Sequence, residues 1–302
     1  MTSEQFAKLL LLSLVWGGSF LFAGMAVEYV HPLWVVTVRV GLAAIVMLLV
    51  LRSLKLSLPN KPSMWLKYIG MGLLNNVIPF SAIFYAQTYI SVSLASIVNS
   101  MTPVFTFIVL ASFGVERLSA NRVLGALVGI AGTALLFSQN LSFSDSLNMG
   151  LLLSLTAALS YAFSGFWAKL FFANQAPVTA STSQLLCSTV VMLILVSVWQ
   201  IPLPEQTPPL SIIAALVGLA VISTAFAYVL FFDVLNKSGP SNASLVTLLI
   251  PISACLLGWI VMGDQLTQVQ ILGAIIISLG LVIIDGRWWH KVRSVISTSG
   301  PN

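Results

Sequence analysis

The sequence predicts an all-α membrane protein with ten transmembrane helices, arranged as two inverted-topology repeats of five helices each. Three observations lead to this prediction. Ten apolar stretches fill nearly the whole 302-residue chain, the basic residues fall in alternate connections, and the second half of the chain repeats the first. Hydrophobic residues make up 58% of the chain and charged residues only 7%, against about 25% charged residues in an ordinary soluble domain.

Each apolar stretch has about the 20 residues that a helix needs to cross a hydrocarbon core about 30 Å thick. Transmembrane strands would alternate apolar and polar side chains, whereas 42–51 and 271–284 are apolar on all sides. The first stretch could be a cleaved signal peptide, but residues 17–20 run on into more apolar sequence, so we interpret it as a retained helix. The predicted spans are 6–27, 33–51, 66–88, 92–113, 121–138, 148–170, 178–199, 210–233, 242–262 and 268–286.

The basic residues predict the orientation of these spans. With a cytoplasmic N-terminus, every connection that carries Lys or Arg lies inside, and the outer connections hold only acids, as the positive-inside rule requires. The net charge of +5 is therefore a topology signal, and a nucleic-acid patch is the weaker interpretation because the bases are spread over many short loops. We expect a multi-pass protein of the bacterial cytoplasmic (inner) membrane with both termini cytoplasmic. The outer acids are Glu28, Asp145, Glu205 and Asp264.

The chain repeats itself. Residues 82–138 match 230–286 at a constant offset of 148, and the front portions match more weakly at an offset of 145. Chance alignment of apolar segments is a poor explanation, because prolines, glycines and an acidic position all keep register. Five spans are an odd number, so the second repeat enters from the opposite face and a pseudo-two-fold axis lies in the membrane plane. Matched pairs include Phe84 with Phe232, Ser93 with Ser241, Pro103 with Pro251, and Glu116 with Asp264.

Several motifs resemble a known repeat. Residues 114–119 (GVERLS) and 263–267 (GDQLT), each followed by a Leu-Gly-Ala segment and further glycines, are similar to the end of an EamA repeat. Residues 84–86 and 93–96, with Trp16-Gly17 and Arg39, extend the resemblance over essentially the whole chain. It points to the drug/metabolite transporter superfamily. Two departures, Val115 in the first loop and Asp264 where Glu is usual, leave the spacing from proline to acid unchanged.

The resemblance implies a first EamA repeat at 1–140, a second at 146–288 and a cytoplasmic tail at 289–302. It also implies a substrate cavity between the halves, lined by helices one to four and six to nine, with helices five and ten at the back. The expected activity is export of amino acids or related metabolites. Inverted halves around such a site are the architecture expected of alternating access.

Arg39 is the only base well inside a predicted span. It lies about six residues from the outer start of the second helix, roughly 9 Å deep. Its side chain could snorkel outward, or it could line a polar cavity and attract a carboxylate. The matching position in the second half is close to Gln184, which is also polar.

Uncharged polar side chains in the spans predict a cavity lining. Ser96, Asn99 and Ser100 share one helix face. Any one of these groups could simply bond to a neighbouring helix, but polar groups facing lipid would stay unsatisfied, so the set favours a cavity. Aromatic residues could contact a substrate, or pack, or lie at the interface. The cavity candidates are Trp16, Arg39, Asn76, Tyr85, Ser96, Asn99, Ser100, Tyr161, Ser164, Trp167, Gln184, Tyr228, Ser244 and Thr247.

Prolines and glycines predict local helix geometry. Pro103 and Pro251 fall near the middle of spans four and nine, where each removes an amide donor and tends to kink the helix. These kinks could be hinges, could shape the cavity or could be static packing features. Small residues let transmembrane helices approach closely, so we expect packing roles for Gly125, Gly129, Gly132, Gly273 and Gly280.

The missing residue types narrow the function. No Asp or Glu lies at mid-membrane, so we expect uncoupled or weakly coupled transport of a neutral or zwitterionic solute. Asp233, at the end of the eighth predicted span, would overturn the expectation of weak coupling if its carboxylate lay buried in the membrane. Proton-coupled efflux of lipophilic cations, the alternative, would need such a carboxylate. A membrane-embedded enzyme would need a catalytic cluster, and ATP coupling would need a phosphate-binding loop; the sequence has neither.

The expected partners are therefore the lipid bilayer and a small-molecule substrate, an amino acid or metabolite. We expect no nucleic acid, metal or cofactor. A channel or a purely structural scaffold is disfavoured, because neither function needs two inverted repeats. Because the chain is already an internal pseudo-dimer, a monomer is sufficient, and a dimer is possible.

Inverted topology predicts that the connections around residues 116 and 264 lie on opposite sides of the membrane. Single cysteines placed in each should react with an impermeant maleimide from opposite faces. Labelling of both from the same face would contradict the inverted repeat.

Overall fold

The structure is a computed structural model that describes residues 2–116, 119–138, 146–173, 175–239 and 245–285. Within these ranges every regular element is helical, as the sequence predicts. Among the described residues, nine helices are long and apolar enough to cross a membrane, and the ninth predicted span, 242–262, corresponds to a shorter apolar helix at Val246–Met262. Ser244 and the predicted tail at 289–302 lie outside the described residues.

Each half contributes five spans, and two of its spans are built from more than one helical segment. The first half comprises α1 (Ser3–Val27), α2 (Pro32–Ser53), α3 (Pro62–Gly72) continuing through a π-helical turn (Leu73–Val77) into α4 (Ile78–Ala86), α5 (Val92–Asn99) followed by α6 (Thr102–Ser112), and α7 (Ala120–Phe137). The second half comprises α8 (Ser146–Phe171), α9 (Pro177–Val198), α10 (Leu210–Ala220) continuing through a π-helical turn (Val221–Phe226) into α11 (Ala227–Ser238), α13 (Val246–Leu257) with a final π-helical turn (Gly258–Met262), and α14 (Gln268–Asp285).

Local sequence fixes several helix starts. Thr2 and Gln5 form a capping box at the start of α1, in which each side chain accepts from the other's backbone N–H at 3.3 and 3.0 Å. Pro32 and Pro177 are the first residues of α2 and α9. Proline suits this position because a backbone N–H in the first turn has no acceptor within the helix, so its absence costs no hydrogen bond. The two helices therefore begin alike in the two repeats.

The two predicted proline kinks differ in the structure. Pro103 lies in the first turn of α6, after the helix has been interrupted at residues 100–101. Span four is therefore two helices joined by a turn rather than one kinked helix. Pro251 lies inside α13.

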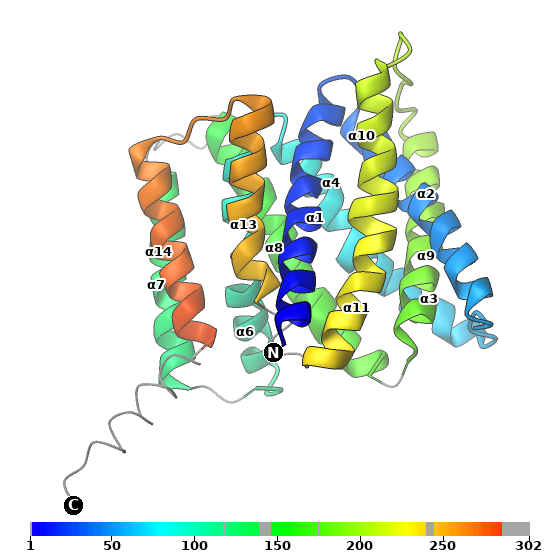
Figure 1. Cartoon of the computed structure of the whole chain (residues 1–302), viewed down its shortest axis with the longest axis horizontal. Coiled ribbons are helices and arrows are strands. Elements are labelled where there is room, and N and C mark those ends of the chain that lie inside the picture. Colours follow the sequence, from blue (N-terminus) through cyan, green and yellow to red (C-terminus); the bar gives the residue numbers. More distant parts are fainter. Residues whose placement is uncertain (1, 117–118, 139–145, 174, 240–244, 286–302) are drawn as a thin grey trace, which may run out of the picture.

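The two halves interleave and share one core. α1 packs against α13, α10 and α11, α2 packs against α9, and α4 packs against α8, so most helices of the first half contact helices of the second (Figure 1). The largest buried cluster accordingly joins residues from both repeats, including Val36 and Phe84 from the first and Leu185 and Leu219 from the second.

The helices α7 and α14 pack side by side at one edge of the bundle (Figure 1). Gly125 and Gly280 are so close that a Cβ added to either would lie 2.6–2.7 Å from the carbonyl oxygen of the other. Gly132 and Gly273 approach each other in the same way further along the pair. Glycine is needed here because the backbones touch, which is the close packing expected of small residues in a membrane.

We expect Gly125→Ala to destabilise the protein. The added methyl group meets backbone atoms of α14 that cannot move aside, an overpacking that typically costs about 1–3 kcal/mol. The measurement is the midpoint of thermal unfolding in detergent.

Gly41→Ala is the matched control, since its new methyl group would meet only the Thr189 Cγ2 at an ordinary 3.6 Å. Equal midpoints for the two variants would show that the α7–α14 contact is looser than described.

Candidate functional site

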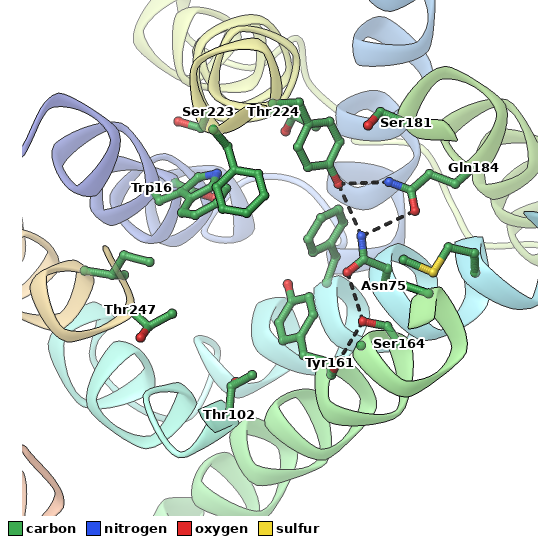
Figure 2. Close-up of a pocket in the computed structure, with 18 of the residues that line it drawn as sticks. Trp16, Asn75, Thr102, Tyr161, Ser164, Ser181, Gln184, Ser223, Thr224 and Thr247 are labelled. Carbon is green, nitrogen blue, oxygen red and sulfur yellow. Dashed lines mark hydrogen bonds between the residues drawn. The ribbon is translucent and has the colours of Figure 1, made fainter. Parts of the chain in front are cut away.

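A cavity of about 920 Å³ lies between the two halves. Its wall is formed by α1, α2, α3, α4, α5, α6, α8, α9, α11, α13 and the two π-helical turns at Leu73–Val77 and Val221–Phe226, and includes no residue of α7 or α14 (Figure 2). It reaches the end of the bundle where the N-terminus lies, because Phe172, Gln175 and Asn236 contribute to the wall there. Among the described residues, no lining side chain comes from the connections at the opposite end.

Two π-helical turns place polar side chains at this cavity. Asn75 and Asn76 lie in the turn that begins at Leu73, and Ser223 and Thr224 lie in the turn that begins at Val221, so the turns start 148 residues apart. π-helical turns are rare and often occur at functional sites. The repeat offset alone could have paired these two polar dipeptides, but no sequence signal marks a π-helical turn.

A network of amide and hydroxyl groups connects the two halves across the cavity wall (Figure 2). The Asn75 Nδ2 donates to the Gln184 Oε1 and the Tyr228 hydroxyl, each at 3.4 Å. The Tyr228 hydroxyl donates to the Asn76 Oδ1 at 3.3 Å, and the Ser164 Oγ donates to the Asn75 Oδ1 at 3.2 Å. The long distances leave room for these groups to exchange partners with a polar ligand.

Arg39 is the only charged residue in the described cavity wall. It is 6% exposed. Its Nε donates to the Thr224 Oγ1 of the other half at 3.0 Å, and its guanidinium carbon lies 3.6 Å from the centre of the Phe80 ring. The side chain therefore points into the bundle and does not snorkel. Gln184 occupies the matching eighth position of α9.

Most of the predicted cavity residues line the wall, and three do not. Asn76 is fully buried behind the wall, where it also donates to Ser188 at 2.9 Å. Tyr85 contacts the His31 Nε2 at 3.3 Å, beyond the cavity, and the Trp167 Nε1 donates to the backbone of the neighbouring α3 at 3.0 Å. The predicted cavity residues in the wall are Trp16, Arg39, Ser96, Asn99, Ser100, Tyr161, Ser164, Gln184, Tyr228 and Thr247. The predicted kink residues Pro103 and Pro251 also line it.

The candidate set did not include an aromatic part of the wall or the second π-helical turn. Phe80 and Phe84 lie beside Arg39, and Phe231 lies 5.4 Å from Trp16, centre to centre. Phenylalanines in an apolar span carry no signal in the sequence that separates a cavity position from a lipid-facing one.

The end of the bundle away from the N-terminus is closed by contacts between the halves. The Asp264 Oδ2 accepts from the Ser93 backbone N at 2.9 Å and from its Oγ at 2.7 Å. The carboxylate lies at the N-terminus of α5, where the helix dipole favours negative charge. Glu116, its counterpart in the first repeat, instead pairs with Arg122 of its own half at 2.6 Å.

Asp233 does not belong to the cavity. Its two carboxylate oxygens accept from Lys8 and Lys237, each at 2.7 Å, near the end of the bundle where the N-terminus lies. No Asp, Glu, Lys or His appears in the described cavity wall. Nor does any group of three or more His, Cys, Asp or Glu side chains among the described residues have a metal-binding arrangement.

Comparisons with known proteins agree with this geometry. The EamA-like transporter family model matches residues 6–138 and again 148–285. The chain is 24% identical to "Uncharacterized transporter YoaV" of Bacillus subtilis (strain 168), covering 89% of this chain and 92% of that protein. It is 26% identical to a "Probable amino-acid metabolite efflux pump" of Escherichia coli (strain K12), covering 95% and 96%.

A solved crystal structure of a protein 20% identical to this chain superposes with a TM-score of 0.65 and covers 94% of this chain and 96% of the other. This likeness concerns the fold. The two family matches confirm the prediction of two tandem repeats.

Proposed function

The chain belongs to the EamA-like transporter family, and we propose that it exports amino acids or related small metabolites by alternating access. One observation carries this proposal. A cavity between the two repeats reaches one end of the bundle, while the Ser93–Asp264 contact joins the repeats at the other end. A carrier that exposes its site to one side at a time needs both features. Two inverted repeats supply a second state of similar energy with the opposite end open.

The orientation follows from the charges. We place both termini in the cytoplasm of a bacterial inner membrane, because the bases then lie inside and the outer connections hold only acids. In that orientation the cavity described here faces the cytoplasm, where an exporter loads its solute.

The cavity wall supports the proposed substrate class and coupling. A volume of about 920 Å³ lies within the usual range for small-molecule sites, about 300–1,000 Å³. No carboxylate lines its described part, which argues against lipophilic cations as substrates and against a proton carrier inside the site. Two of the matched relatives are named as probable amino-acid metabolite efflux pumps, which supports amino acids and their derivatives for this chain.

Uptake into proteoliposomes tests the proposal. We expect transport of at least one labelled amino acid or derivative above empty liposomes, with an initial rate that an imposed pH gradient changes little. Asp233→Asn should leave the pH response as it is, because Lys8 and Lys237 hold this carboxylate outside the cavity. A strong pH-gradient dependence that Asp233→Asn abolishes would identify Asp233 as a proton carrier and contradict weak coupling.

The Ser93–Asp264 contact should set the balance between the two open states. Asp264→Ala removes two hydrogen bonds to a charged group, and a loss of about 1.5 kcal/mol would shift the population about tenfold. In a background without Cys187 and Cys255, a cysteine at Asn99, in the cavity wall, should then react faster with an impermeant reagent from the outer face.

Glu205→Gln is the matched control, since Glu205 is an exposed acid in a connection on the same face. If the cysteine at Asn99 reacts from the outer face at the same rate in Asp264→Ala and in Glu205→Gln, the Ser93–Asp264 contact does not hold that end of the bundle closed.

A further inference from the structure

We propose that Arg39 binds the carboxylate of the substrate, and that the cavity selects solutes that combine a carboxylate with an apolar body and does not require an ammonium group. The inference rests on the proposed function and narrows its substrate class. It is carried by the way the guanidinium is held, by the charge balance of the wall and by the arrangement of its apolar side chains.

The guanidinium is fixed on one side and free on the other. Its Nε donates to the Thr224 Oγ1 at 3.0 Å, and the Phe80 ring covers one face of the guanidinium, with its centre 3.6 Å from the guanidinium carbon. The two terminal nitrogens donate to no other described residue, although the side chain lines the cavity. Held in this way, Arg39 presents two parallel N–H groups, the arrangement that matches the two oxygens of a carboxylate.

The charge of Arg39 has no acidic partner among the described residues. No acidic side chain lies in the described cavity wall, and Arg39 makes no ion pair with any described residue. Tyr161 and Tyr228 also line the wall, but a phenol is an uncharged group at physiological pH. A buried cation without a counter-ion is costly, so an anionic group entering the cavity would be favoured strongly.

The rest of the wall suits a small amphipathic acid. Near Arg39, the network of Asn75, Gln184 and Tyr228 can donate to further carboxylate or carbonyl oxygens. Trp16 and Phe231, in ring contact at 5.4 Å, supply an apolar surface from α1 and α11. No carboxylate of the described wall is available for an ammonium group, so the amine of an amino acid contributes little to binding.

Four compounds with the same phenyl body separate these charges: 3-phenylpropionate, L-phenylalanine, L-phenylalaninamide and 2-phenylethylamine. Binding to the detergent-purified full chain is measured by isothermal titration calorimetry. We expect 3-phenylpropionate to bind at least as tightly as L-phenylalanine, and the amide and the amine to bind about 10- to 100-fold more weakly, the effect of losing a charge-assisted pair.

Variants assign this preference to Arg39. Arg39→Gln reproduces the residue at the matching position of the second repeat and should erase the difference between acid and amine. Arg39→Lys keeps the charge but loses the two parallel N–H groups of the guanidinium, and should retain a preference for acids with a reduced affinity. Lys67→Gln is the control, because Lys67 also lies over a phenylalanine ring, at 4.7 Å, but outside the cavity wall.

Three results would overturn the inference: tighter binding of the amine than of the acid, an unchanged acid preference in folded Arg39→Gln, or no binding of any of the four compounds. If Arg39→Gln does not fold, an affinity of Arg39→Lys for 3-phenylpropionate equal to that of Lys67→Gln would also count against it. Proteoliposome transport keeps the proposals apart. Acid-selective binding without transport refutes the carrier function alone, and transport of uncharged or cationic solutes alone refutes only the role of Arg39.

Discussion

The hydrocarbon layer offers no hydrogen-bond partner, and this constraint governs the rest of the structure. Backbone groups must be satisfied within helices, and polar side chains must meet one another or an aqueous cavity. Between the repeats, the described residues Asn75, Gln184 and Tyr228 satisfy this rule by bonding to one another. The same constraint makes Arg39 informative, because a charge is placed there only at considerable cost.

The constraint also explains how much the sequence could predict. The number of spans follows from the apolar stretches, and the two repeats follow from residues that match at a constant offset. The predicted all-helical fold of two repeats is confirmed. The polar positions on α5 and α8, such as Ser96 and Ser164, lie in the cavity wall, where the spacing of polar residues in apolar spans indicates them. Arg39 could be assigned to a cavity only after Thr224 and Phe80 were seen beside it.

Other features depend on angles that composition does not encode. A π-helical turn inserts a residue and rotates the following helix by about 100° relative to a regular one, so the inward face of the third span changes at Leu73–Val77. Asn75 reaches the cavity and Asn76 lies behind it, since consecutive residues of a helix point about 100° apart. Tyr85 and Trp167 show a different limit: amphipathic rings suit interfaces and packing as well as cavities, and here they bond to His31 and to the backbone of α3.

The glycine contact between α7 and α14 has a consequence for biogenesis. The chain emerges from the ribosome in order, so α7 enters the bilayer long before residues 268–285 exist. Until α14 arrives, lipid tails must cover the exposed backbone around Gly125 and Gly132, and the nascent first repeat lacks its neighbours from the second repeat. This edge is therefore completed only when α14 arrives, and a chain truncated before α14 would leave the glycine face of α7 uncovered.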